Sequence, residues 1–203
     1  MKCFAVSTAG MCPMDHKVHL YSRYNDMSRW SFWETGSIKD MIKFFSRNCL
    51  ESLKPGERYS INHEGYNVHA IVNEDNNLFA FYAFTDKDYP RRLAYKMLEE
   101  IQFEFKKAVG ESWKNMKQDD KIKVVKMEEV FHKYKDATKI DALTIANMKV
   151  EKVQGVLIDN MKQLLERQES LDAMVQKSED LTQKTKIFYK NTDKMNSKCC
   201  TLI

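Results

Sequence analysis

The chain has 203 residues, which is enough for one domain of ordinary size and an extension. Hydrophobic residues make up 43% of it, so a packed core is expected, and charged residues make up 31%, which favours exposed helix as well. The formal net charge of +4 is small, and no dense basic patch with interleaved aromatic residues occurs. We therefore do not expect nucleic acid as a partner.

The cysteines and the absence of long apolar runs point to a reducing compartment. Residues 1–10 lack the basic and apolar regions of a secretory signal, and no run of about 18 apolar residues could span a bilayer. We predict a cytoplasmic protein without disulfides. The cysteines are not spaced as zinc ligands; they are Cys3, Cys12, Cys49, Cys199 and Cys200.

Strand and helix patterns alternate in the first part of the chain. Residues 2–9 and 18–24 carry apolar side chains at every second position, as half-buried strands do. A helix is predicted from about Ile38, with a capping box made by Ser37 and by Asp40 three residues later.

Three more strands and two more helices follow. The strands are predicted over residues 58–62, 66–72 and 78–84, and the helices over 90–109 and 124–134. The order predicts an α+β domain, with a five-stranded antiparallel sheet flanked by helices.

The chain changes character near residue 136. All Trp, all Pro and every Gly except Gly155 lie before that point, and a segment with so few helix breakers is typical of a long helix. We predict a domain over residues 1–136, a linker over 137–142, a helical segment over 143–196, called the tail below, and a C-terminal peptide over 197–203.

The tail carries the pattern of a coiled-coil seam. In steps of three and four residues from Leu143, most positions are apolar, as in helices that pack against other helices. Polar residues interrupt the seam at Asn160, Ser178, Thr185 and Thr192, so it is too polar for a strong homodimer. These polar positions fit specific roles or a partly frayed coil equally well. The apolar seam residues used below are Leu143, Val150, Val153, Leu157, Leu164, Leu171, Met174, Leu181 and Phe188.

Arg167 lies in the middle of this seam. Burying a guanidinium group costs several kcal/mol unless it is paired and hydrogen-bonded. Either partner helices bring acceptors to this level, or Arg167 is a surface residue that falls on the seam by chance. The pattern alone leaves both interpretations open.

The last residues fit a lipidation signal. Cys200-Thr201-Leu202-Ile203 matches the C-a-a-X pattern for prenylation of Cys200, and Cys199 beside it could take a palmitoyl chain. Two lipid chains hold a protein on a membrane, whereas one holds it only marginally. The final Ile leaves farnesyl and geranylgeranyl both open.

These features together resemble the prenylated longin R-SNAREs, the lipid-anchored relatives of synaptobrevin. The resemblance is strongest in residues 164–172, Leu-Leu-Glu-Arg-Gln-Glu-Ser-Leu-Asp, and continues through residues 176–181 and 188–190. Residues 30–33 and 88–91 resemble the longin domain of the same family. One departure is the loop of residues 11–17, which looks longer than usual.

The resemblance implies a longin (profilin-like) domain followed by a long SNARE helix. It also implies that the tail joins three glutamine SNARE helices on an opposing membrane, with Arg167 meeting their glutamines, and that zippering draws the two membranes together. The protein would cycle between the cytoplasm and the cytosolic faces of the Golgi, of ER-derived vesicles and of the endosome or vacuole. The transport step and the cognate SNAREs stay open.

The resemblance further implies that the longin domain folds back on the tail. On the helix from Ile38, Phe44 lies about 120° from the centre of the predicted core face, near Phe32 in the Trp30–Trp33 segment. We predict that Phe44 and Phe32 border an apolar groove that the tail covers. The alternative is that Phe44 is a peripheral core residue.

No catalytic pattern occurs. The sequence lacks G-x-x-x-x-G-K-[ST], H-E-x-x-H and G-x-S-x-G, so we predict no enzyme and no cofactor apart from covalent lipids. His16 and His19 lie near Cys12 without a fourth ligand, so no metal is expected, and Cys49 is expected to be a buried thiol. The alternative function is a membrane-tethered coiled-coil trafficking adaptor or scaffold without fusion activity, which would have no need of Arg167.

Overall fold

A computed structural model gives the fold of the chain, and it describes all residues except 64, 75–78, 151–153, 167–169, 188 and 190–203. Arg167, Val153, Phe188, Cys199 and Cys200 therefore lie outside the described residues. Within the described part, no helix has the length and the apolar character needed to cross a bilayer.

The domain is an α+β fold around one mixed sheet. The strands are β1 (Cys3–Met11), β2 (Val18–Asn25), β3 (Arg58–His63), β4 (Tyr66–Val72), β5 (Phe79–Asp86) and β6 (Val156–Ile158). Their order in the sheet is β2-β1-β5-β4-β3-β6. The α+β class and the first five strands agree with the prediction, and these five strands pair antiparallel.

The sheet has a sixth strand that the sequence pattern did not predict. Strand β6 comes from the tail and pairs parallel to β3, so the predicted five-stranded antiparallel sheet is wrong in number and in direction. The reason lies in the edge of the sheet. Strand β3 would otherwise present unpaired N–H and C=O groups, and the apolar run of residues 156–158 supplies their partner.

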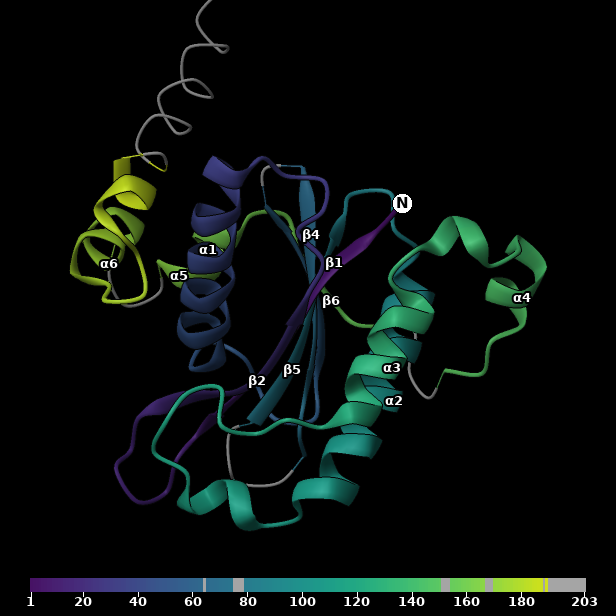
Figure 1. The fold of residues 1–203 in the computed structure, drawn as a ribbon, viewed down its shortest axis with the longest axis horizontal. Coiled ribbons are helices and arrows are strands. Elements are labelled where there is room, and N and C mark those ends of the chain that lie inside the picture. The colour runs from purple at the N-terminus through teal and green to yellow at the C-terminus, as the bar shows by residue number, and fades with distance from the viewer. Residues whose placement is uncertain (64, 75–78, 151–153, 167–169, 188, 190–203) are drawn as a thin grey trace, which may run out of the picture.

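Helices cover both faces of the sheet (Figure 1). On one face lie α1 (Phe32–Leu50), α5 (Met161–Leu165) and α6 (Leu171–Lys177). On the other lie α2 (Arg91–Val109), α3 (Val125–Tyr134) and α4 (Ala142–Asn147), and the short 3-10 turns are η1 (Ser112–Asn115) and η2 (Ala137–Lys139). Each layer has its own apolar core, and the core beside α1 contains residues of the tail.

Helix α1 begins earlier than predicted. Ser31 is its N-cap, and the Ser31 backbone N–H donates to the Glu34 carboxylate at 3.0 Å, which makes the capping box. The predicted box at Ser37 and Asp40 is wrong, because both residues lie inside the helix. Gly36 does not break the helix, and Asp40 bonds the tail instead.

The tail is not one long helix in this structure. Its described residues form α4, β6, α5 and α6 in turn, and residues 183–187 are again helical. Two polar residues of the predicted seam lie at the breaks: Asn160 accepts a hydrogen bond from the Lys162 N–H at 2.9 Å as the N-cap of α5, and Ser178 ends α6. The residues that weaken the seam therefore also end and begin the shorter elements.

Candidate functional site

The site is the contact between the tail and helix α1. After β6 the chain crosses to the α1 face, where α5 and α6 lie beside α1 (Figure 1). The core on this face contains Phe44, Phe45 and Cys49 of α1 together with apolar residues of the tail. The buried tail residues in it are Met161, Leu164, Leu165, Leu171, Val175, Leu181 and Tyr189.

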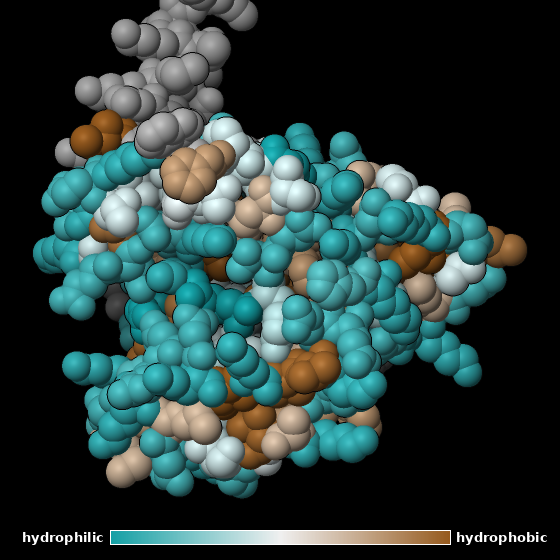
Figure 2. Space-filling view, viewed as in Figure 1, coloured by the Kyte–Doolittle hydropathy of each residue, from teal (hydrophilic) through white to brown (hydrophobic). Residues whose placement is uncertain are grey.

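The folded-back tail buries apolar side chains in the core. Figure 2 shows a face that is largely hydrophilic, with hydrophobic residues in separate small areas. A free SNARE seam would instead expose Leu164, Leu171 and Leu181, which are at most 6% exposed here. The folded-back arrangement thus removes apolar surface from water, and each Å² of apolar surface buried stabilises it by about 25 cal/mol.

One stripe of α1 is turned toward the tail. Asp40, Phe44 and Arg47 are spaced by four and three residues, so they share one side of the helix. Asp40 and Arg47 both bond the tail directly. Phe44 lies between them and is 1% exposed, so we infer that the tail covers its ring.

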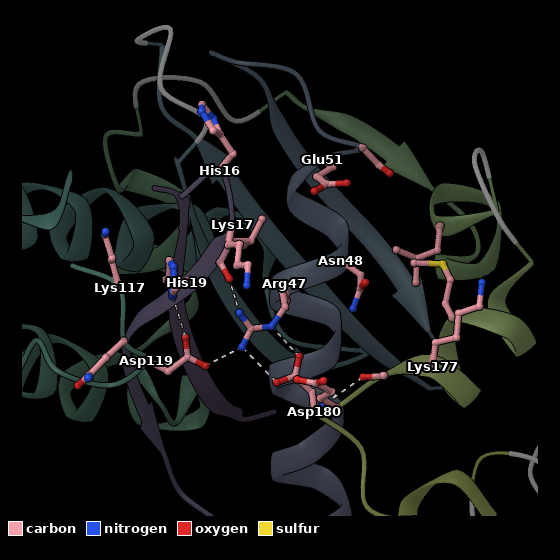
Figure 3. A pocket seen from close by; sticks show the side chains of 17 residues that line it. His16, Lys17, His19, Arg47, Asn48, Glu51, Lys117, Asp119, Lys177 and Asp180 are labelled. Carbon is pink, nitrogen blue, oxygen red and sulfur yellow. Dashed lines mark hydrogen bonds and ion pairs between the residues drawn. The ribbon is translucent and has the colours of Figure 1, made fainter. Parts of the chain in front are cut away.

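Arg47 joins the tail to the domain (Figure 3). Its Nε donates to Asp180 Oδ2 at 2.7 Å and its Nη2 donates to Asp119 Oδ2 at 2.6 Å, while Nη1 donates to the Val18 carbonyl. Burial opposes the charged guanidinium, but the two carboxylates outweigh burial and hold the pKa of Arg47 above its ordinary value. Asp119 is held in turn by the Leu20 N–H at 2.9 Å. The hydrogen bond between Arg47 and Asp180 is charge-assisted and partly shielded from water. It therefore fixes the chain just after α6 on the domain.

The Arg47 bonds lie in a polar cleft of about 870 Å³ between the β1–β2 hairpin, α1 and α6. Basic and acidic side chains both line the cleft, including Lys17, Lys117 and Asp119. This mixture makes the contact dependent on charge as well as on apolar burial.

Asp40 and His63 hold the end of the described tail. Asp40 Oδ2 accepts from Thr185 Oγ1 at 2.9 Å, and Thr185 is fully buried. Tyr189 stacks on His63 with ring centroids 6.3 Å apart, and His63 meets Phe45 edge-on at 4.7 Å. Burial lowers the pKa of His63 to about 4, so the ring is neutral at neutral pH.

The predicted seam residues divide into three groups. Leu164, Leu171 and Leu181 are buried in the core that the tail shares with α1 and the sheet, and Met174 packs partly buried against that core. Val150 packs partly against the α2 core. Leu143 and Leu157 are 71% and 64% exposed.

The two predicted groove residues lie in different surroundings. Phe44 is buried in the core that the tail shares, whereas Phe32 is the first residue of α1 and is 86% exposed. The core that the tail shares with the domain therefore includes Phe44 and does not include Phe32.

Sequence reasoning missed the charged contacts and four buried tail residues. Met161, Leu165, Val175 and Tyr189 are buried but lie off the seam, because the heptad steps select a single stripe. Arg47 and Asp180 are far apart in the sequence, and no local pattern pairs them. The spacing of Met161 and Leu165 by four residues was the one available signal of a second apolar stripe.

The cysteines of the domain are buried. Cys49 is 0% exposed, as predicted, and burial raises the pKa of its thiol, so it stays protonated. Cys12, Asp15 and His19 offer potential ligand atoms within 4.8 Å of one another, while His19 Nε2 bonds Asp15 at 3.0 Å and Cys12 donates to the Lys114 carbonyl. Asp15 was not among the residues that the sequence singled out.

Comparison with known proteins identifies the class. Residues 27–131 match the longin family, described as a regulated-SNARE-like domain, and residues 142–202 match the synaptobrevin family. The VAMP-like protein YKT61 of Arabidopsis thaliana is 30% identical over 203 residues, which is 100% of both chains. The synaptobrevin homolog YKT6 of Saccharomyces cerevisiae is 31% identical over 184 residues, 90% of each chain.

The protein is thus a SNARE with a longin domain, a non-enzymatic component of vesicle fusion. Within that class, the chain belongs to the family of YKT6-type synaptobrevin homologues, as the sequence resemblance implied. It acts on membrane-traffic pathways by pairing with other SNAREs.

Proposed function

We propose that the chain is an R-SNARE whose longin domain holds its own SNARE segment in reserve. In this proposal residues 1–136 form the longin domain, and residues 143–196 form the SNARE segment that assembles with three glutamine SNARE helices. Arg167 supplies the central layer, and the Cys199-Cys200 peptide anchors the chain. The destinations are the endomembranes expected above.

One observation supports the proposal that the longin domain holds the SNARE segment in reserve. Leu164, Leu171 and Leu181 belong to the seam that partner helices would bury, and the same side chains are buried against the longin domain. A side chain cannot be buried in both places at once. The folded-back chain and the SNARE complex therefore exclude each other, and partners gain access only when the tail leaves α1.

Arg167 tests the assembly part. We expect the full chain to form a detergent-resistant four-helix complex with a matched set of glutamine SNARE helices. Arg167→Leu places an apolar group against three glutamines and leaves their amides unpaired, so we expect weaker assembly by about 1–3 kcal/mol. Arg167→Leu combined with Gln→Leu in the partners should recover stability. An equally stable or more stable Arg167→Leu complex with unchanged partners would favour the scaffold alternative.

The anchor is tested by fractionation. We expect Cys200→Ser to leave the protein cytosolic, because the prenyl chain is lost, and Cys199→Ser to leave it only transiently on membranes. Adding one residue after Ile203 keeps both thiols but ends the C-a-a-X match, so it should behave as Cys200→Ser does. Unchanged membrane association of Cys200→Ser would refute the anchor.

A further inference from the structure

Gly155 stands immediately before strand β6, where the tail joins the sheet. Residues Val156, Leu157 and Ile158 pair with Tyr59, Ser60 and Ile61 of β3, so Gly155 lies beside Arg58 at the start of this pairing.

No side chain fits at this position. A Cβ on Gly155 would lie 2.7 Å from the Arg58 carbonyl oxygen and 2.8 Å from Tyr95 Oη. Real Cβ atoms essentially never approach other atoms that closely, so one of the two neighbours would have to move.

Neither neighbour is free to move. The Arg58 carbonyl is backbone of β3, whose other edge is paired with β4 through Arg58 and Ile71. Tyr95 is fully buried, and its Oη lies 3.0 Å from Ser60 Oγ, which bonds His69 Nδ1 at 2.8 Å. Both obstacles belong to the rigid part of the domain, so β6 would have to give way.

The same glycine has the opposite effect in a helix. Gly155 lies between the seam residues Val153 and Leu157 without being on the seam, so a helical tail would turn it away from partner helices. Glycine in an exposed helix interior disfavours the helix roughly fivefold relative to alanine. Position 155 thus favours the strand and disfavours the helix through one missing methyl group.

We propose that Gly155 sets the balance between the folded-back tail and the helical tail: glycine admits β6 to the sheet, and any side chain shifts the tail toward the helix that assembles. This proposal rests on the proposed function, since it names the residue that tunes the reserve state. In this proposal Gly155 both allows β6 to pair with β3 and lowers the helix propensity of the free tail.

The test compares Gly155→Ala with the wild type in the full chain without lipid. Hydrogen exchange at residues 156–158 and 161–165 is expected to rise about tenfold or more, because the clash and the helix propensity act in the same direction. The rate of complex formation with glutamine SNARE helices should rise by a similar factor. Exchange in β1 and β5 should not change.

Two further variants separate the causes. Gly36→Ala makes the same substitution inside α1, where a Cβ meets nothing within 4 Å, and it should leave exchange in the tail unchanged. Gly155→Val adds a larger clash with little gain in helix propensity, so opening by Val as large as by Ala assigns the effect to the clash.

Equal exchange at residues 156–158 in Gly155→Ala and wild type would overturn the proposal, as would loss of protection throughout β1 and β5. The exchange measurement does not require partner helices. If wild type forms no SNARE complex, the proposed function fails, while the exchange data still decide the role of Gly155.

Discussion

Phe44→Glu is expected to release the tail from α1 while the sheet stays folded. Phe44 lies on the stripe between Asp40 and Arg47, which both bond the tail, and its ring is buried in the shared core. A carboxylate there loses the apolar contacts of the ring, worth about 3–5 kcal/mol, and resists burial. When the tail leaves α1, its apolar contacts are lost, but the introduced carboxylate regains its contact with water. The variant therefore favours the released tail.

Hydrogen exchange measures this release. We expect protection from Met161 to Leu181, the part of the tail beside α1, to fall by about a hundredfold or more, whereas β1 and β5 keep theirs. Phe45→Glu is the matched variant, because the Phe45 ring meets His63 of β3 edge-on at 4.7 Å, and it should reduce protection of the whole domain. Equal tail protection in Phe44→Glu and wild type would contradict the covered groove, and general loss would make Phe44 a peripheral core residue.

Local patterns in the sequence were sufficient for the five antiparallel strands of the domain. Strands β1 to β5 have alternating or continuous apolar residues because each strand buries at least one face. This pattern is local to each strand, so it can be recognised without knowing the rest of the fold. The start of α1 was misplaced because two capping boxes compete, at Ser31 and at Ser37. The box at Ser31 adds two turns of helix, and these turns include the exposed Phe32.

Local patterns could not predict the tail, because its sequence is compatible with two structures. The heptad steps describe a helix among partner helices, and Asn160 and Ser178 look like defects in it. In the folded-back chain the same two residues are an N-cap and a helix end. Which structure forms depends on the free edge of β3 and on the apolar side of α1, and both are properties of the folded domain.

A pair of substitutions in α6 is expected to separate the two structures of the tail. Leu171 and Val175 lie four residues apart and are both buried, at 3% and 1% exposure. Leu171 also belongs to the predicted seam, whereas Val175 is adjacent to it, at a position where coiled coils accept charge. Val175 is therefore needed only for the folded-back chain, and Leu171 is needed for both structures.

Val175→Asp should open the chain and speed assembly with glutamine SNARE helices, because burying the carboxylate against α1 costs about 2–4 kcal/mol and the complex does not bury it. Leu171→Asp should open the chain to a similar extent but yield no detergent-resistant complex. Exchange across α6 reports opening, and gel analysis of the complex reports assembly. Gln176→Asp adds the same charge at an exposed position of α6 and should change neither. If Val175→Asp lost assembly as fully as Leu171→Asp, the seam would be misplaced and the mutual exclusion of the two structures would lose its basis.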